Sequence, residues 1–598
     1  ETVPETFHCT WNKRISILLL GASFLVVTAL FINYLHFDFM LVILPIIVIA
    51  ALFILDVLPA VVKNAITIAF IALYAWKIYP MMEGDWLKMM FAAIFLIGGL
   101  LTLIPGFSYK GKRMGFYPFA AMTILGLFML VSATTNLVFF MGWELMALGS
   151  FMLILRGKKS EFPAFRYILF SAGGAYLLLA AFAIIHSFAN GTYFASISGH
   201  FTHISIAFSL LVLGFFTKVA AIGLHIWIPD AYAEAEDDAT PLVSGVLINA
   251  GVLGLILTVF AFGRINMGHV SLYYWMGWIG ALTAVAGNML AIYEEDMKRL
   301  IAYSSMAAMG YIIFALAINS KLGILIALFY TAIHFLYKTL LFVSAAGVAY
   351  RTKTHLMYQM GGLIKPMPIS FIAVLIGIIT AAGMPPLAGF AGKWMFYNAV
   401  VMKGWYLQGL LVFFSGIVAF LYLYKLIASV FLGQMKDHLR KVKEAPIWFL
   451  IPQIVFILGI MILSAQPNLI LQPLANVIPT KVMGEQIQWD GNLAMTSFGY
   501  WNAFAILSIV IIMFAVLFLW LYINSRKAQK VKQFNIVFAA ERPFRPETTH
   551  VSYNMFAGYN KALGFMVHPL ATKFWTAVSN FCEAVADKVR SWYNGDGQ

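Results

Sequence analysis

Long apolar stretches recur along the sequence, and they limit the folds open to it. A helix needs about 20 apolar residues to cross the bilayer core. Alternating strands typical of a membrane β-barrel are not seen, and lipid offers the backbone no hydrogen-bond partners, so helices remain as the spanning element. The sequence predicts an all-α integral membrane protein with about 16 transmembrane helices. The predicted spans are 15–35, 39–57, 60–80, 88–107, 116–133, 136–156, 166–188, 204–228, 241–263, 273–293, 300–318, 322–350, 367–397, 406–432, 447–466 and 498–524.

The composition excludes several other classes of protein. Of the 598 residues, 62% are hydrophobic and 11% are charged, whereas about a quarter of the residues of a soluble globular protein are charged. Cys9 and Cys582 are the two cysteines, which is too few for an iron–sulfur cluster or a cysteine-bound metal. We therefore expect no metal or cofactor in this chain.

The charge of the loops predicts the orientation. With a cytoplasmic N-terminus, one set of loops carries eighteen Lys and Arg residues, and the opposite set carries Arg264, Lys321, Lys403 and Lys481, with two more at its edges. This asymmetry follows the positive-inside rule, so the net charge of +14 indicates cytoplasmic loops rather than nucleic-acid binding. We expect 15–35 to be a retained span rather than a signal peptide, and both termini to be cytoplasmic.

The chain beyond the last span changes character. Residues 533–552 are polar and predict an extended loop. At 571–592 apolar side chains recur every three or four positions, with charged residues between them. This pattern predicts an amphipathic helix that lies on the membrane or against a partner, the alternative being an ordinary surface helix. The predicted spans and the change in composition after residue 524 divide the chain into four parts. These are N-terminal transmembrane helices (1–110), a core (111–432), C-terminal transmembrane helices (433–524) and a cytoplasmic or interfacial tail (525–598).

Nine ionisable side chains inside the predicted spans are candidates for a function, because a charge there costs at least about 2.5–3.5 kcal/mol on insertion scales. Asp56, Lys63 and Lys425 lie near span ends, where snorkelling is a sufficient explanation. The remaining side chains call for a partner, water or a function. They are Glu144, Lys218, His225, His334, Lys338 and Lys393.

Glu144 and Lys218 have opposite charges and lie near the middle of their spans. They are either a buried ion pair that fixes helix packing or part of a functional site. Buried ion pairs rarely stabilise a protein, because desolvation offsets the Coulomb gain, so we favour function. An amine and a carboxylate that share such a site titrate as a coupled unit, which suits a proton path.

A second set of polar residues lies further along the chain. His334 and Lys338 are four residues apart and share a helix face with Tyr330. Lys393 follows Pro385 and Pro386, which with neighbouring glycines must break the span 367–397. Histidine relays protons near neutral pH. Asn249 lies between the two sets in the sequence and can orient water, although it cannot carry a proton.

Five motifs in this order resemble a known family. They are GWELMALGSFML around Glu144, FFTKVAAIGLHIWIPDA around Lys218, DMKRLIAYSSMAAMGYI at 296–312, HFLYKTLLF at 334–342 and GMPPLAGFAGKW before Lys393. Together they resemble the antiporter-like, proton-translocating membrane subunits of respiratory complex I, Mrp cation/proton antiporters and membrane-bound hydrogenases. The tail NIVFAAERPFRPETTHVSYNMFAGYNKALGF looks most like the large membrane subunit of Ech-type energy-converting [NiFe] hydrogenases.

The resemblance implies two inverted five-helix repeats in a proton-translocating core over 111–432, each repeat with a broken helix. Lys218 and Lys393 match the lysines of the broken helices, Glu144 the acid paired with the first lysine, and Lys338 the bridging lysine. The implied path runs along a buried polar axis with half-channels to each side, supported here by His225.

Three positions depart from the family pattern. Gly223 stands where many relatives have the proline that breaks the first lysine helix, and Tyr330 where some have a second histidine. Asn249 replaces a histidine or lysine. Either water bridges the two half-channels at this position, or the link between them is looser. The acidic loop 230–239 (DAYAEAEDDA) could gather cations at the mouth of the path, but we expect a plain solvated loop.

These features predict a subunit that moves H⁺, or H⁺ against Na⁺, in the prokaryotic cytoplasmic membrane. Its redox active site would lie in partner subunits, as in a [NiFe] hydrogenase or a complex I-like oxidoreductase. The resemblance implies other membrane subunits and a soluble arm that carries Ni–Fe or iron–sulfur clusters. The alternatives are a structural membrane anchor without transport and a stand-alone Mrp-type Na⁺/H⁺ antiporter subunit.

Overall fold

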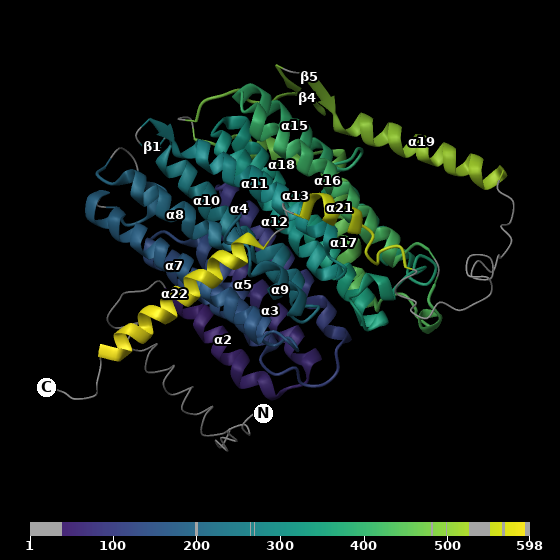
Figure 1. Ribbon diagram of the computed structural model, residues 1–598, viewed down its shortest axis with the longest axis horizontal. Coiled ribbons are helices and arrows are strands. Elements are labelled where there is room, and N and C mark those ends of the chain that lie inside the picture. Colours follow the sequence, from purple (N-terminus) through teal and green to yellow (C-terminus); the bar gives the residue numbers. More distant parts are fainter. Residues whose placement is uncertain are drawn as a thin grey trace.

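The computed structural model describes residues 39–189, 191–197, 201–263, 265–267, 269–433, 435–479, 482–497, 499–524, 550–564 and 569–592. The predicted span 15–35, Cys9 and nearly all of the predicted loop 533–552 lie outside the described residues, as do the basic residues between 526 and 532. Figure 1 shows the described chain as a bundle of helices, with short strands at its margin.

The helices follow one another with short connections, and several of them begin or end in a short 3₁₀ or π turn (η). The N-terminal part contains η1 Phe39–Ile43, α2 Leu44–Ile54, η2 Leu55–Val57, α3 Ala60–Ile78, η3 Tyr79–Met81, α4 Trp86–Leu103 and η4 Ile104–Ser108. The middle part contains α5 Phe116–Ser132, α6 Asn136–Leu155, α7 Glu161–Ala189, η5 Phe194–Ser196, α8 Ile204–Val219, α9 Ile228–Glu234, η6 Leu242–Leu247, α10 Asn249–Phe262, α11 Leu272–Tyr293, α12 Met297–Ile318, α13 Lys321–Thr352, η7 Met357–Gln359, α14 Pro368–Ala382, α15 Ala388–Lys403 and α16 Tyr406–Val430. The C-terminal part contains η8 Asp437–Leu439, α17 Ile447–Ala465, α18 Asn468–Ala475, α19 Ala503–Asn524, α21 Ala557–Leu563 and α22 Leu570–Trp592.

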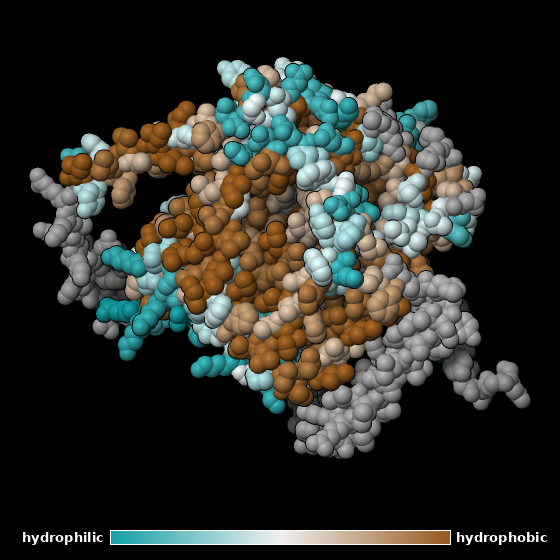
Figure 2. Space-filling model, turned by 180° about the vertical axis from the view of Figure 1, so that it is seen from behind, coloured by the Kyte–Doolittle hydropathy of each residue, from teal (hydrophilic) through white to brown (hydrophobic). Residues whose placement is uncertain are grey.

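The bundle has the surface of an integral membrane protein. Twelve helical segments within the described residues are long and apolar enough to cross a bilayer, and α5, α8 and α14 are shorter apolar helices. Figure 2 shows a broad apolar belt over one face, with hydrophilic side chains gathered mainly at its margins. These segments coincide with fifteen of the predicted spans, so the all-α membrane fold is confirmed. The total of 16 stays a prediction.

Two helix groups, α5–α10 and α11–α16, run in opposite directions through the bundle. Arg113, just before α5, and Lys298, in the first turn of α12, both bind carboxylates of the loop 234–238. We call the end of the bundle that contains this loop the charged end. Since α11 directly precedes α12, it ends at the charged end, whereas α5 begins there. This inversion is the arrangement implied by the resemblance.

Both groups pack their first two helices through glycine. A Cβ atom at Gly126 of α5 would lie 2.6 Å from the backbone nitrogen of Met146 in α6. A Cβ atom at Gly280 of α11 would likewise lie 2.6 Å from the backbone nitrogen of Phe314 in α12. Glycine thus lets the two backbones approach closely at equivalent places in both groups.

The fourth helix of each group is broken, as the sequence predicts for 367–397 and the resemblance for 204–228. The first break lies between α8 and α9 and includes Gly223, whose φ is +87°. The second lies between α14 and α15 and includes Pro385 and Pro386. A positive φ costs glycine little, so Gly223 suits this break without a proline.

Small β-sheets were not predicted. A two-stranded sheet joins β1 (Asn266–Met267) to β2 (Val270–Ser271), and an antiparallel sheet contains β3 (Gln488–Asp490), β4 (Leu493–Thr496) and β5 (Gly499–Asn502). Both sheets lie in connections between spanning helices, where polar groups can pair at the membrane boundary. The apolar scan includes β5 in the predicted span 498–524, although α19 begins at Ala503.

The prediction that Asp56, Lys63 and Lys425 snorkel to water is wrong. The Lys63 side chain is 1% exposed, and its Nζ lies 2.7 Å from Asp56 Oδ1. The second carboxylate oxygen of Asp56 accepts a hydrogen bond from the backbone N–H of Gly115 at 2.6 Å. Lys425 is also buried, at 2% exposure. Neighbouring helices cover these span ends, which a linear scan of hydropathy does not show.

The predicted C-terminal amphipathic helix is present as α22. Its large apolar side chains are exposed, including Phe574 at 60% and Phe581 at 68%. Near its start, the indole of Trp575 packs on Phe170 of α7 and donates a hydrogen bond to the carbonyl oxygen of Gly223 at 2.7 Å. Figure 1 shows α22 crossing the bundle in front of α7. The tail is therefore tied to the first broken helix, while most of its apolar face stays open.

The contact between α11 and α12 predicts the effect of one methyl group. Gly280→Ala should destabilise the protein by about 1–3 kcal/mol, because the new Cβ atom would meet backbone atoms that cannot move aside. Thermal unfolding in detergent measures this change. Gly173→Ala on α7 is the matched control, since a Cβ atom there meets nothing within 4 Å. Equal unfolding temperatures for the two variants would contradict the packing argument.

Candidate functional site

Lys218 lies in the last turn of α8, in a pocket of hydroxyl groups. Its side chain is 1% exposed, and its Nζ donates hydrogen bonds to Tyr167 Oη at 2.7 Å and Ser171 Oγ at 3.1 Å. Tyr167 Oη also lies 2.5 Å from Ser150 Oγ of α6. The C-terminal end of a helix favours a cation, so α8 itself stabilises the ammonium group.

Glu144 of α6 lies near this pocket but is not a direct partner of Lys218. Their charges interact, yet within the described part of the chain no carboxylate lies within 4.0 Å of Lys218 Nζ. The hydroxyl groups of Tyr167 and Ser171 hold the ammonium instead. The sequence analysis missed these two residues, although they lie four positions apart on one face of a predicted span.

The first break satisfies its free backbone groups with side chains from several elements. Trp227 Nε1 donates to the carbonyl of Thr217 at 3.0 Å, and the backbone N–H of Ile222 donates to Thr283 Oγ1 at 2.9 Å. His225 Nδ1 accepts the N–H of Gly223 at 3.2 Å. His225 therefore supports the break and does not contact Lys218 through any described hydrogen bond.

Asn249 begins α10, and Ile248 separates it from the π turn η6. Its Nδ2 donates to the carbonyl oxygens of Gly245 and Val246 at 2.8 and 3.2 Å. Its Oδ1 is buried without a hydrogen-bond partner among the described residues. This oxygen is therefore free to accept a hydrogen bond from water.

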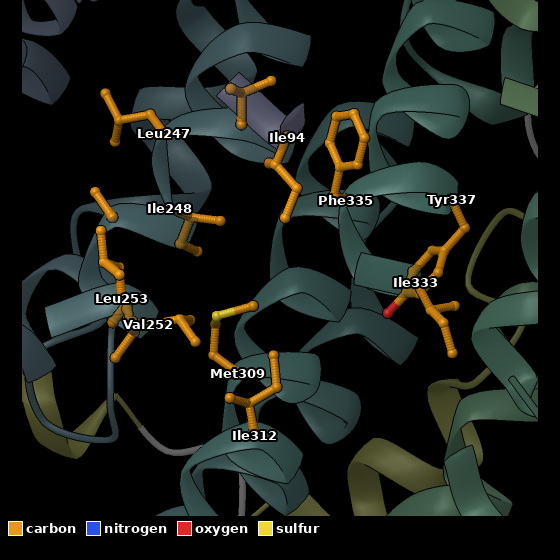
Figure 3. Close-up of a cluster of buried hydrophobic side chains, with 14 of the residues drawn as sticks. Ile94, Leu247, Ile248, Val252, Leu253, Met309, Ile312, Ile333, Phe335 and Tyr337 are labelled. Atoms are coloured by element: carbon orange, nitrogen blue, oxygen red, sulfur yellow. The ribbon is translucent and has the colours of Figure 1, made fainter. Parts of the chain in front are cut away.

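An apolar cluster lies between η6–α10 and the helices α12 and α13. Figure 3 shows Leu247, Ile248 and Val252 on one side of it and Met309, Ile312 and Phe335 on the other. Each of these side chains is at most 4% exposed. The cluster separates the two halves of the core beside Asn249.

The second half of the core encloses a cavity that gathers four predicted residues. The cavity has a volume of about 40 Å³, enough for about three water molecules. Tyr330, His334, Lys338 and Lys393 all line it. Polar residues that the sequence analysis missed line it as well, namely Asn288, Ser304, Tyr311, Tyr337 and Tyr422.

The basic groups at this cavity are held in different ways. Lys338 Nζ donates to Ser304 Oγ and, at 3.2 Å, to the carbonyl oxygen of Ile301. Lys393 Nζ donates at 2.5 Å to the carbonyl oxygen of Ala382, the last residue of α14. Both ring nitrogens of His334 and the hydroxyl of Tyr330 are buried without a hydrogen-bond partner in the described structure. These groups can therefore bind water in the cavity.

Glycine at the second break makes room for Lys393. A Cβ atom at Gly383, where φ is +65°, would lie 2.5 Å from the Lys393 side chain. The break also exposes the carbonyl of Ala382 that receives the ammonium group. The second break therefore both makes room for the Lys393 side chain and provides the acceptor of its hydrogen bond.

The acidic loop at the charged end is not a plain solvated loop, so that expectation is wrong. Its five carboxylates bind cations from several elements that are distant in sequence. The ion pairs are Asp230 with Arg166 and Arg299, Glu234 with Arg299, Glu236 with Arg113 and Arg156, Asp237 with Lys298 and His355, and Asp238 with Arg113. The fold brings these cations together, which spacing along the sequence does not reveal.

Two carboxylates in this network differ in environment. Burial alone would raise the pKa of Asp237, but Lys298 and His355 outweigh it and lower this pKa to about 2. Asp238 is more deeply buried, and burial holds its pKa above the usual value despite the attraction of Arg113. Asp238 therefore depends strongly on Arg113, whose guanidinium group lies 2.6 Å away.

Comparison with known proteins identifies the central region. Residues 133–421 match the family described as NADH:quinone oxidoreductase/Mrp antiporter, transmembrane. This segment is a membrane domain of that family. It includes Glu144, Lys218, His334, Lys338 and Lys393, so the resemblance drawn from the five motifs is confirmed at this level. The narrower likeness to Ech-type hydrogenases stays a prediction.

Three relatives show how far the likeness extends. An Na(+)/H(+) antiporter subunit of Alkalihalophilus pseudofirmus is 26% identical, over 70% of this chain and 56% of that protein. Hydrogenase-4 component B of Escherichia coli is 30% identical, over 49% of this chain and 46% of that protein. The chain thus spans about half the length of these curated relatives. A chain of the membrane-bound sulfane sulfur reductase, an archaeal respiratory membrane complex, is 27% identical with a TM-score of 0.81, over 94% of this chain and 96% of that chain.

The pairing of Arg113 with Asp238 predicts a large effect on stability. Arg113→Gln should cost about 3–5 kcal/mol, because it leaves a carboxylate with 1% side-chain exposure without its main partner. The double variant Arg113→Gln/Asp238→Asn should recover part of the loss. Thermal unfolding in detergent measures both variants.

The exposed ion pair between Arg590 and Asp587 provides the control. Its side chains are 81% and 72% exposed, so Arg590→Gln should leave the unfolding temperature unchanged. If Arg113→Gln behaves in the same way, the ion-pair network does not stabilise the charged end.

Proposed function

We propose that this chain is the ion-translocating membrane subunit of a multi-subunit, redox-driven respiratory complex. The chain would move H⁺, or H⁺ against Na⁺, while partner subunits carry out the redox chemistry. The observation that carries the proposal is the cavity that joins Lys338, His334 and Lys393 inside a membrane-embedded bundle. Buried ionisable groups in a membrane are costly and mark ion or proton pathways.

The geometry supports transfer in two stages. In the first repeat, Lys218 would exchange protons with Glu144 through the hydroxyl groups of Tyr167 and Ser171. In the second, water in the cavity would pass a proton between Lys338 and Lys393, with His334 as the relay. Asn249, beside the apolar cluster, would orient the water that joins the two stages.

The complex around this chain belongs to the proposal. The likeness to the sulfane sulfur reductase chain, which extends over almost the whole sequence, supports a respiratory assembly with other membrane subunits. A soluble arm would carry Ni–Fe or iron–sulfur clusters, as in a hydrogenase or a complex I-like enzyme. The basic loops support a cytoplasmic position for the charged end and for both termini. The membrane would be the cytoplasmic membrane of a prokaryotic cell.

A stand-alone Mrp-type antiporter is the second candidate. It is favoured by the match to the Alkalihalophilus pseudofirmus antiporter protein over 70% of this chain. Such a protein would exchange Na⁺ and H⁺ by using the membrane potential, with no electron-transfer partner. A purely structural anchor is disfavoured by the cost of burying Lys218, Lys338 and Lys393.

Removing either lysine of the broken helices should stop transport. Lys218→Met and Lys393→Met should each lower ion uptake coupled to turnover by at least about tenfold, because each removes a group that carries protons. The measurement uses vesicles reconstituted with the whole complex and records H⁺ and Na⁺ uptake. Lys441→Met is the control, since Lys441 is an exposed loop residue. Coupled uptake that survives both core substitutions would leave the structural anchor as the better explanation.

Purification from the native membrane should separate the redox-driven complex from the antiporter. In the proposed complex, soluble subunits that contain iron, and nickel if they form a hydrogenase, copurify with this chain in mild detergent. Metal analysis and mass spectrometry of the purified material give the answer. Isolation with membrane subunits alone, together with Na⁺/H⁺ exchange driven by a membrane potential, would favour the antiporter.

A further inference from the structure

A row of polar side chains leads from the cavity toward the charged end, between α11 and α16. Tyr422 and Asn288 line the cavity, and the Tyr422 hydroxyl donates a hydrogen bond to Asn288 Oδ1 at 2.9 Å. Asn288 Nδ2 in turn donates to the carbonyl and hydroxyl oxygens of Ser415, each at 2.8 Å. The interface between these two helices is therefore polar at the level of the cavity.

Lys425 continues this row one turn beyond Tyr422. It lies on the same face of α16, is 2% exposed, and donates from Nζ to the carbonyl of Ile292 at 3.2 Å. That carbonyl belongs to the last turn of α11, where a cation is favoured. Ser429, one turn further along α16, is fully buried, and its Oγ has no hydrogen-bond partner among the described residues. The path through Lys218, Lys338 and Lys393 gives Lys425 no role.

Carboxylates stand where this row meets the charged end. Glu294 and Glu295 follow directly after α11, and their charges interact with Lys425. Burial raises the pKa of Glu294 to about 7, although Arg299 and Lys425 act in the opposite direction. A carboxyl group of this kind takes up and releases protons near neutral pH.

The tail covers this position. We call residues 550–563, which include α21, the cap segment. The Phe556 ring is 7% exposed, and its centroid lies 5.9 Å from Lys425 Nζ. The backbone N–H of Asn554 donates to Glu295 Oε1 at 3.1 Å, and the Tyr553 ring packs against Tyr358. Figure 1 shows α21 beside α16. The cap segment thus separates Lys425 from the surface at the charged end.

We propose that Lys425 carries protons between the charged end and the cavity at Lys393, along the interface of α11 and α16, and that the cap segment is the lid of this branch. The inference rests on the proposed function and adds both a proton-carrying residue and the part of the tail that controls access to it. Protons would enter at Glu294, pass to Lys425 and reach the cavity beside Tyr422 and Asn288.

Thiol labelling tests the lid. Lys425→Cys is introduced into the full chain with Cys9→Ser and Cys582→Ser, and a membrane-impermeant thiosulfonate is applied to the charged end. With the native cap segment, labelling should be at least about tenfold slower than with Phe556→Ala added, because the ring blocks access. Phe574→Ala in α22 is the control and should leave labelling slow, since that side chain is already exposed. Equal labelling rates with Phe556 and with Phe556→Ala, whether fast or slow, would overturn the lid.

Transport by the whole complex tests the branch. Lys425→Met should lower coupled ion uptake by at least about tenfold, and Lys425→Arg should lower it as well, because a guanidinium group keeps its charge but does not release its proton. Each variant is first shown to assemble with its partner subunits by size-exclusion chromatography. If Lys393→Met loses coupled uptake and Lys425→Met takes up ions like the wild type, the branch through Lys425 is overturned and the proposed function stays intact. Absence of coupled uptake in the wild type would overturn both.

Discussion

A backbone carbonyl or N–H group without a hydrogen-bond partner in the interior of a membrane protein costs several kcal/mol, and the two broken helices each create such groups. The second break exposes the carbonyl of Ala382, which receives the ammonium group of Lys393. The first break is completed by Trp227 and Thr283 from within the core and by Trp575 from the tail. The need to satisfy these groups determines which side chains gather at the centre of each repeat.

The two repeats meet this need differently. Lys218 lies at the end of the segment before its break and bonds to hydroxyl groups. Lys393 lies on the segment after its break and faces a cavity with several tyrosines. Apolar side chains separate the two regions (Figure 3). The halves of the core are thus related in fold but not in their polar environment, which gives each lysine its own set of proton partners.

Much of this architecture could be predicted from the sequence, because long apolar stretches and helix-breaking residues leave a strong local pattern. The spans, both breaks and the amphipathic tail helix are of this kind. The grouping of Lys338, His334 and Lys393 also followed from motifs close together along the chain. Contacts between distant segments could not be predicted in this way. The pairing of the acidic loop, the burial of Lys63 and Lys425, and the tyrosines at the cavity all depend on which helices become neighbours.

The hydrogen bond from Trp575 to Gly223 has a consequence for biogenesis. Its partners are separated by 352 positions, so the bond cannot form until the ribosome has translated the chain as far as Trp575. Until then, the carbonyl oxygen of Gly223, between α8 and α9, lacks this hydrogen bond or accepts one from water or a chaperone. The first repeat therefore reaches its mature form only after all the helices of the second repeat have been translated.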